Sequence, residues 1–331
     1  MSFLCKRLGF VVGRNFTGRN LSPRVAIVVY FAAIFLGGSL IGPWVWKLMQ
    51  WLAGLMPFLQ ELADEPFRRY VTRSWMIIGA VGLWPFLKCV GANSLRGAGL
   101  RLGAQFRGEI GIGFAIGFGS LALVAVVALL FGGRELNLGH EPARWFKHLM
   151  NATLAAIIVS FIEEVFFRGA IFGGLRKQHR LVTAALISGM LYAIVHFFER
   201  SIWTEPVTWS SGLVLLPRML RGFGELEQLI PGFLSLTLAG MMLALAYRRT
   251  GALYFSMGLH AGWIFWGKSY GFLTMPVKGA NAWFWGTGKL TDGWLAFVLL
   301  AGMFVGFWRW NGAGDETEEK ETGNAEVVDE T

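Results

Sequence analysis

Apolar residues fall in long blocks that are separated by short polar connections. Within the blocks they follow neither the period of 2 of a half-buried strand nor the period of 3.6 of an amphipathic helix. Most blocks approach the ~20 residues that an upright helix needs to cross a bilayer. The pattern predicts an all-α, polytopic integral membrane protein with about eight transmembrane helices. The predicted spans are 25–46, 75–91, 110–131, 149–172, 181–198, 232–247, 251–267 and 293–310.

The connections between the blocks predict how the helices are arranged. Residues 175–180 and 248–251 leave room only for tight turns, so the fourth and fifth spans, and the sixth and seventh, should be antiparallel neighbours. Lys and Arg gather before the first span and in the connections after the second, fourth and sixth spans. Because basic loops stay in the cytoplasm and the number of spans is even, we expect both termini to be cytoplasmic. We expect the protein in the plasma (inner) membrane of a bacterium.

Three further segments carry their own predictions. Residues 47–62 are amphipathic and are predicted to lie flat in the membrane interface. Residues 198–231 mix Trp and charged residues with apolar ones, and are predicted to form a partly inserted loop. Gly113 and Gly117, in the third span, have the small-xxx-small spacing of close helix packing.

Composition agrees with a membrane protein and argues against a nucleic-acid partner. Of the 331 residues, 54% are hydrophobic and 15% are charged, whereas soluble domains are about one quarter charged. The net charge of +9 comes from short basic clusters between apolar blocks, where Lys and Arg contact lipid headgroups. We therefore expect the lipid bilayer, and no nucleic acid, as the partner of these residues. Cys5 and Cys89 provide neither a disulfide framework nor a metal motif.

A few ionisable residues lie inside the predicted spans. They are Glu163, Glu164, Arg168, His196 and His260. A charge in hydrocarbon costs roughly 2.5–3.5 kcal/mol on insertion scales, so such residues face a wet or protein-lined interior and are functional candidates. At 1.5 Å per residue, Glu163 and His196 lie roughly 20–25 Å from the turn at Arg180, and His260 lies roughly 13–15 Å from Gly251. Three helices thus bring a carboxylate and two imidazoles to overlapping depth. His140, His148 and His179 lie in or beside polar connections, and we assign them no role.

Helix geometry divides the two glutamates. Glu164 and Arg168 are four residues apart in the order that favours an ion pair, whereas Glu163 points about 100° away. We expect Arg168 to compensate Glu164 and Glu163 to face the two histidines. A carboxylate with two imidazoles can activate water, stabilise a carbonyl oxyanion and protonate a leaving amine. The same three residues could instead hold zinc, but there is no HExxH and the histidines lie on separate helices, so we favour a site without a cofactor.

The order and spacing of these residues resemble a known family. The segments that match are Glu163-Glu164-x-x-x-Arg168, Tyr192-x-x-x-His196, and His260 with its flanking residues. They are similar to the motifs EExxxR, FxxxH and HxxxN of the CPBP family, the CAAX-prenyl-protease and bacteriocin-processing intramembrane endopeptidases related to Rce1. The resemblance covers about residues 149–267.

The resemblance implies roles for individual residues. It implies that Glu163 activates water with the help of His196, and that His260 stabilises the oxyanion. Tyr192 replaces the usual Phe and keeps the aromatic ring. Ile264 stands in place of the usual Asn, so one oxyanion donor is missing, and such a loss can cost ~10²–10³ in rate. The substrate implied is a membrane-associated peptide or protein, prenylated or of leader type.

Two other classes of function stay open. A catalytically weak or inactive scaffold or immunity-type protein could use the same fold, and the missing Asn favours it. A transporter with a Glu/His proton relay is the second, although no pair of interrupted spans suggests an inverted repeat. The sequence has no signature of a particular substrate or oligomeric state.

The patterns together divide the chain into five segments. The predicted segments are a basic cytoplasmic arm (1–24), N-terminal transmembrane helices with the interfacial segment (25–148), a four-helix catalytic core (149–267), a last loop and helix (268–310) and an acidic disordered tail (311–331). The tail lacks apolar content and carries a run of acids, which is typical of solvated chain.

Overall fold

A computed structural model describes residues 22–90, 92, 94–101, 103, 106–198, 201–224 and 226–328, with the backbone alone beyond residue 312. The basic residues Lys6, Arg7, Arg14 and Arg19, on which the predicted orientation partly depends, lie outside the described residues.

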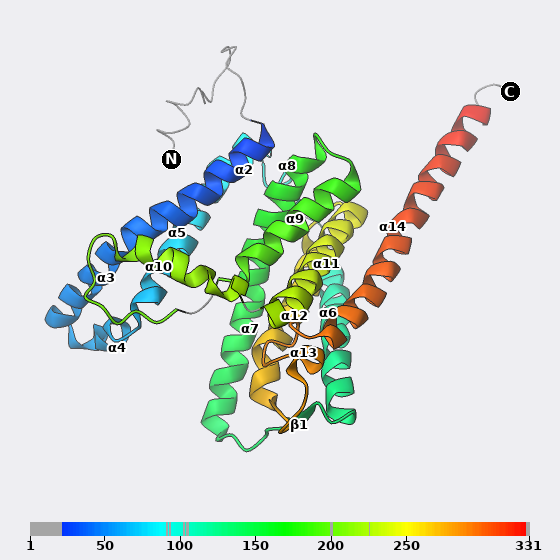
Figure 1. The fold of residues 1–331 in the computed structure, drawn as a ribbon. Coiled ribbons are helices and arrows are strands. Elements are labelled where there is room, and N and C mark those ends of the chain that lie inside the picture. The colour runs from blue at the N-terminus through cyan, green and yellow to red at the C-terminus, as the bar shows by residue number, and fades with distance from the viewer. Residues whose placement is uncertain are drawn as a thin grey trace, which may run out of the picture. The chain divides into compact units, whose positions relative to one another are not determined.

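The fold is all-α, as predicted, and a helix lies at each of the eight predicted spans (Figure 1). The first is continuous through α2 (Pro23–Ala32), the π-helix η1 (Ala33–Gly37) and α3 (Gly38–Leu55), and the fourth through α7 (Pro142–Glu164), the π-helix η3 (Val165–Phe172) and α8 (Gly173–Arg176). The others are α5 (Phe67–Cys89), α6 (Phe106–Leu130), α9 (Leu181–Val195), α11 (Leu226–Thr250), α12 (Tyr254–Leu273) and α14 (Trp294–Val328).

The connections hold short elements. The helical ones are η2 (Pro57–Leu59), α4 (Gln60–Ala63), α10 (Ser211–Met219), η4 (Leu220–Gly224) and α13 (Ala282–Trp285). Within the described residues the only strands are β1 (Arg134–Leu136) and β2 (Thr274–Pro276), which pair antiparallel with Glu135 opposite Met275. Arg134, on β1, is buried and donates hydrogen bonds to the side chain and the carbonyl of Thr274, and its guanidinium lies over the ring of Tyr270.

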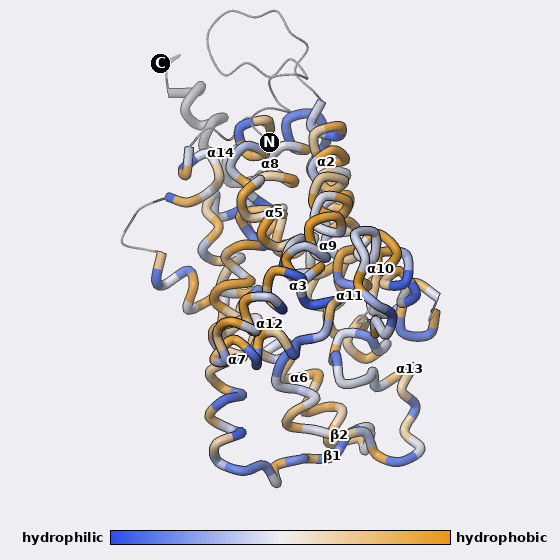
Figure 2. The backbone as a smooth tube through the Cα atoms, turned by 90° about the vertical axis from the view of Figure 1, so that its left-hand side faces the viewer, coloured by the Kyte–Doolittle hydropathy of each residue, from blue (hydrophilic) through white to orange (hydrophobic). Residues whose placement is uncertain are grey.

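Among the described residues, four helices are long and apolar enough to cross a membrane. They are Pro23–Leu55, Phe106–Leu130, Leu226–Thr250 and Trp294–Gly312. Large apolar side chains on them face outward; Val28 is 67% exposed and Leu130 is 76% exposed. Figure 2 shows hydrophobic residues along the helices. Since water would not tolerate so much exposed apolar surface, this is a polytopic membrane protein.

Two predicted boundaries differ from the structure. The segment predicted at 47–62 is not a separate interfacial helix, because its first part continues α3 to Leu55. The helix ends there since Pro57 disfavours helical backbone at Met56, which is extended (φ −132°, ψ 94°). In the region of the predicted disordered tail, the backbone of α14 continues as a helix to Val328. That stretch has no proline and is rich in Glu, which is a strong helix former.

The chain forms two compact units. Unit 1 comprises residues up to Asn93 with Gly173–Lys177 and His196–Glu225, and unit 2 comprises Ser94–Phe172, Gln178–Val195 and the chain from Leu226 onward. In unit 1, α3 packs against α5, and Trp75 donates to the hydroxyl of Ser39 at 3.1 Å. In the same unit Gly212 of α10 lies against the carbonyl of Ser39, where a side chain would not fit.

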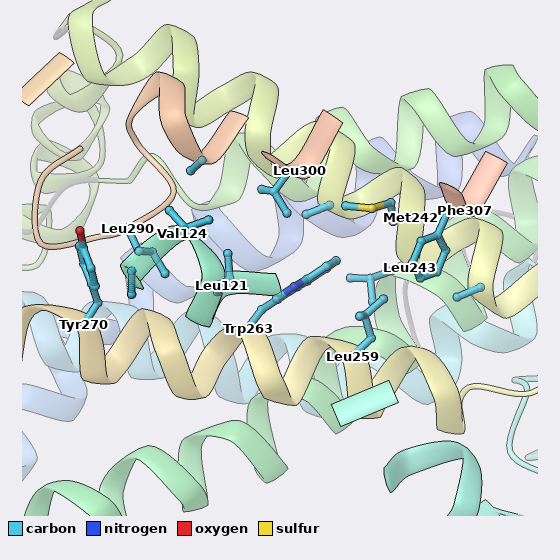
Figure 3. Close-up of a cluster of buried hydrophobic side chains, with 14 of the residues drawn as sticks. Leu121, Val124, Met242, Leu243, Leu259, Trp263, Tyr270, Leu290, Leu300 and Phe307 are labelled. Carbon is cyan, nitrogen blue, oxygen red and sulfur yellow. The ribbon is translucent and has the colours of Figure 1, made fainter. Parts of the chain in front are cut away.

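The core of unit 2 lies between α6, α11, α12 and α14. Figure 3 shows side chains from these four helices meeting in one apolar cluster. Those labelled include Leu121 and Val124 from α6, Met242 and Leu243 from α11, Leu259 and Trp263 from α12, and Leu300 and Phe307 from α14. This cluster fixes α12 from one side and leaves its other side to α7, which carries the two glutamates.

Candidate active site

The site candidates of unit 2 come from three parts of the fold that are separated along the chain. Glu163 and Glu164 are the last two residues of α7, and Arg168 lies in the π-helix η3 that follows. Tyr192 lies near the end of α9, and His260 lies in the second turn of α12. Helices with π-type turns are rare and are often found at functional sites, so the change of helix type directly after Glu164 agrees with a special role for this segment.

Glu164 and Arg168 form a fully buried ion pair. Their side chains are 0% exposed, and Arg168 Nη1 lies 2.9 Å from Glu164 Oε1. Arg168 also donates to the carbonyl of Gly240 on α11 at 3.2 Å and lies over the ring of Tyr192 at 4.8 Å. The pairing agrees with the i,i+4 spacing. It also ties α7 to its neighbours α9 and α11 through one guanidinium.

His260 lies between the two glutamates. Its Nδ1 is 2.9 Å from Glu164 Oε1, and its Nε2 is 3.7 Å from Glu163 Oε2 and 3.1 Å from the hydroxyl of Tyr192. The ring is 2% exposed. The expectation that Glu163 faces His260 is met. Glu164 faces Arg168 as expected, and the same oxygen of Glu164 also contacts His260, which was not predicted.

The two neighbouring carboxylates have different surroundings. The side chain of Glu164 is completely buried, whereas that of Glu163 is 24% exposed. An exposed edge allows water and substrate to reach Glu163, and the ion pair leaves Glu164 to hold the other groups in place. Of the two carboxylates, Glu163 is therefore the one that water can reach.

Residues 144–266 match the family described as type II CAAX prenyl endopeptidase, Rce1-like. This segment is an Rce1-like domain. The match confirms the family predicted from the motifs, and it extends from the second residue after the start of α7 to the middle of α12. A search of curated proteins and a search of solved structures gave no match.

His196 is a predicted site residue within the Rce1-like domain, but it does not belong to unit 2. The helix α9 ends at Val195, three residues before the predicted end of that span, and His196 follows in the next turn, with an exposed side chain. His196 belongs to unit 1, so its partnership with Glu163 stays a prediction. Ile264 lies on α12 one turn after His260 and is partly buried.

Glycines set the position of α12 in the Rce1-like domain. Gly258 and Gly262 flank His260, and they meet the backbone of α6 so closely that an added Cβ would overlap Ile110 and Phe118. Gly113 and Gly117 of α6 are matched in the same way against the carbonyls of Phe255 and Leu259. The α6 glycines were predicted to pack helices. Their partners on α12 were missed, although Gly258-x-x-x-Gly262 has the same spacing.

The described residues contain no group of three or more His, Cys, Asp or Glu side chains arranged to hold a metal ion. His260 uses Nδ1 for Glu164 and Nε2 for Tyr192, and both ring nitrogens are therefore engaged by protein groups. A chelator test is therefore needed to decide whether zinc takes part in the reaction.

Proposed function

We propose that this protein is an intramembrane endopeptidase in which Glu163 activates a water molecule to hydrolyse a peptide bond of a membrane-associated peptide. The observation that carries the proposal is the position of Glu163, a partly accessible carboxylate 3.7 Å from Nε2 of His260. The Rce1-like domain supports the reaction class. A prenylated or leader-type peptide is the substrate class that we propose.

The residues of unit 2 provide the parts of the reaction. Glu163 takes one proton from water, and the oxygen of that water attacks the carbonyl carbon while the carbonyl π electrons move onto oxygen. His260 lies beside Glu163 with Nε2 3.7 Å from that carboxylate, and a carboxylate on the opposite ring nitrogen steadies such a ring during reaction. Glu163 then gives its proton to the leaving nitrogen as the C–N bond breaks. Water is consumed, and a carboxylic acid and an amine are formed.

The proposed setting is the plasma (inner) membrane with both termini in the cytoplasm. We propose that Glu163 lies inside the membrane span predicted at 149–172, where a membrane-bound peptide can reach it. The substrate would approach from the bilayer, which agrees with the apolar surface of α6, α11 and α14.

Substitution of Glu163 by Gln tests the proposal. Gln keeps the shape of the side chain and cannot accept the proton, so cleavage of a fluorescence-quenched farnesylated peptide with a C-terminal CAAX sequence should fall by about 10³ or more. Glu65→Gln is the matched control, because Glu65 has nearly the same side-chain exposure (23%) and lies outside the site. Purified Glu163→Gln should retain the expression level and the thermal unfolding temperature of the wild type. Full cleavage by Glu163→Gln would overturn the proposal.

A non-catalytic scaffold or immunity-type role is the second candidate, favoured by Ile264, which has no hydrogen-bonding group one turn after His260. The same variant separates the two, because a scaffold would keep its biological function with Gln at position 163. Incubation with a chelator separates glutamate chemistry from zinc chemistry. Glutamate chemistry predicts unchanged cleavage and zinc chemistry predicts its loss.

A further inference from the structure

Tyr192 is a buried tyrosine whose hydroxyl reaches the active-site histidine. Its side chain is 3% exposed, and its hydroxyl oxygen lies 3.1 Å from His260 Nε2. The ring packs edge-on against Phe167, with a centroid distance of 5.3 Å, and under the guanidinium of Arg168. A phenylalanine would make both ring contacts equally well. What tyrosine adds at this position is a hydroxyl that contacts His260.

The direction of that hydrogen bond follows from the other side of the ring. Glu164 Oε1 lies 2.9 Å from His260 Nδ1 and is paired with Arg168, and a carboxylate can only accept a hydrogen bond. Nδ1 therefore carries the hydrogen. In the neutral ring Nε2 then has a free electron pair, so the hydroxyl of Tyr192 donates to it.

Two anchors on separate helices hold the ring of His260. Glu164 reaches it from α7, and Tyr192 reaches it from α9. The torsion that turns an imidazole about its bond to Cβ has broad minima, so one hydrogen bond leaves the ring free to swing. With both anchors in place Nε2 stays 3.7 Å from the Glu163 carboxylate. The helix α12 itself gives no second anchor one turn further on, because Ile264 has no polar group.

We propose that the Tyr192 hydroxyl is a positioning group for catalysis, which holds His260 with Nε2 beside Glu163. The inference rests on the proposed peptidase function of the same site. It couples two sequence positions on different helices, because a polar side chain at 264, one turn after His260, could provide a second anchor for the ring when the hydroxyl at 192 is removed.

A double-mutant cycle of Tyr192→Phe and Ile264→Asn tests the coupling with the farnesylated CAAX peptide. In Tyr192→Phe, kcat should fall about 10- to 100-fold with KM within twofold, because the His260 ring is misplaced whereas peptide binding is unchanged. Ile264→Asn should raise the kcat of that variant at least fivefold more than it changes the kcat of the wild type. Tyr30→Phe, which removes another buried tyrosine hydroxyl bonded to a backbone carbonyl in unit 1, should leave kcat unchanged. A kcat of Tyr192→Phe within twofold of the wild type would overturn the inference and leave the proposed function intact.

Nitrogen NMR of histidine-labelled protein tests the hydrogen bond without any substrate. In the wild type the His260 signals should show a protonated Nδ1 and a hydrogen-bonded, unprotonated Nε2. In Tyr192→Phe the Nε2 signal should shift toward that of an unprotonated nitrogen with no hydrogen bond, and in Tyr30→Phe it should not shift. Wild-type protein that cleaves no CAAX peptide but shows these signals would count against the proposed function and for the positioning contact. A wild-type Nε2 without a hydrogen bond would overturn the positioning role, even if Tyr192→Phe did not fold.

Discussion

The contact between α7 and α12 has a histidine at each end, and the two histidines are held in different ways. The helices run in opposite directions, so the end of α7 meets the beginning of α12, and the beginning of α7 meets the end of α12. At the first end His260 contacts Glu164 and Tyr192. At the second end the ring of His148 stacks on Phe272 with centroids 3.9 Å apart, and its Nε2 bonds to the hydroxyl of Ser269 at 3.1 Å.

The partners decide what each histidine can do. Phe272 lies between the rings of His148 and His140, and these aromatic contacts need no charge. The carbonyl of Phe272 also bonds to His140 at 2.8 Å. His260 has carboxylates near both ring nitrogens and can therefore take part in proton and charge chemistry. A polar residue at a helix contact is thus a packing residue or a chemical one according to the charges around it.

The largest expected effect is the loss of the buried charge pair at the catalytic end. Glu164→Gln leaves Arg168 buried without a counter-charge, and such a change costs about 3–5 kcal/mol of unfolding free energy. Cleavage should also fall sharply, because His260 loses the carboxylate charge at Nδ1. Denaturant unfolding in detergent measures the first effect. The double variant Glu164→Gln/Arg168→Met should recover part of the stability and none of the cleavage. Wild-type stability in Glu164→Gln would contradict the ion pair.

The next effect comes from the α6–α12 contact that positions His260. Gly117→Ala places a methyl group on the carbonyl of Leu259, and overpacking of this kind costs about 1–3 kcal/mol. Cleavage should fall with stability, since α12 must move. Gly119→Ala is the matched control two residues away on the same helix, where an added Cβ meets no atom within 4 Å. Equal effects of the two substitutions, read from unfolding curves and cleavage rates, would show that the close approach is unimportant.

A smaller effect is expected at the other end of α12. Arg134→Met removes the donor to Thr274 and the cation over Tyr270, so stability should fall by about 1–2 kcal/mol. The cleavage rate of the folded protein should stay that of the wild type, because no catalytic group contacts this end. Rates normalised to folded protein provide the check. A catalytic defect in the folded fraction would remove the distinction between the two ends.

The smallest expected effect is a dependence of stability on pH at His148, which lies outside the span predicted at 149–172. Burial, and then the nearby His140, lower the pKa of His148 from its usual 6.5. Since the folded state binds this proton less well than the unfolded state, the protein should lose a little stability as the pH falls below 6.5 toward the lowered pKa, and no more below that. His148→Phe keeps a ring on Phe272 and should remove this part of the pH dependence. Melting temperatures at pH 7.5 and pH 5 measure it, and an unchanged difference would exclude His148 as the cause.

The sequence predicts the helices better than their ends. Long apolar blocks place all eight helices, because membrane helices are determined by local composition. The end of α9 before His196 and the continuation of α3 to Leu55 depend on local backbone geometry that hydropathy does not report.

For the site, the sequence predicts the contact between residues that are close along the chain, but only some of the contacts between residues that are far apart. The spacing of Glu164 and Arg168 is sufficient to predict their contact. The contact of Glu164 with His260, 96 residues away, depends on how α7 and α12 pack, and the geometry of a single helix does not predict it. The sequence showed the hydroxyl of Tyr192 as a departure from the motif, but its contact with His260 could be identified only from the fold.

The buried pair of Glu164 and Arg168 also has a consequence for how the protein is made. Each charge alone would oppose insertion of the helix into the bilayer by roughly 2.5–3.5 kcal/mol. Because both lie on one helix, one turn apart, they can neutralise each other as soon as that segment leaves the ribosome, before any later helix exists. His260 follows 96 residues later, which is on the order of 5–20 s of synthesis. The membrane therefore receives the pair of Glu164 and Arg168 already within one helix, and the proposed centre of Glu163 and His260 is completed only when most of the chain has been inserted.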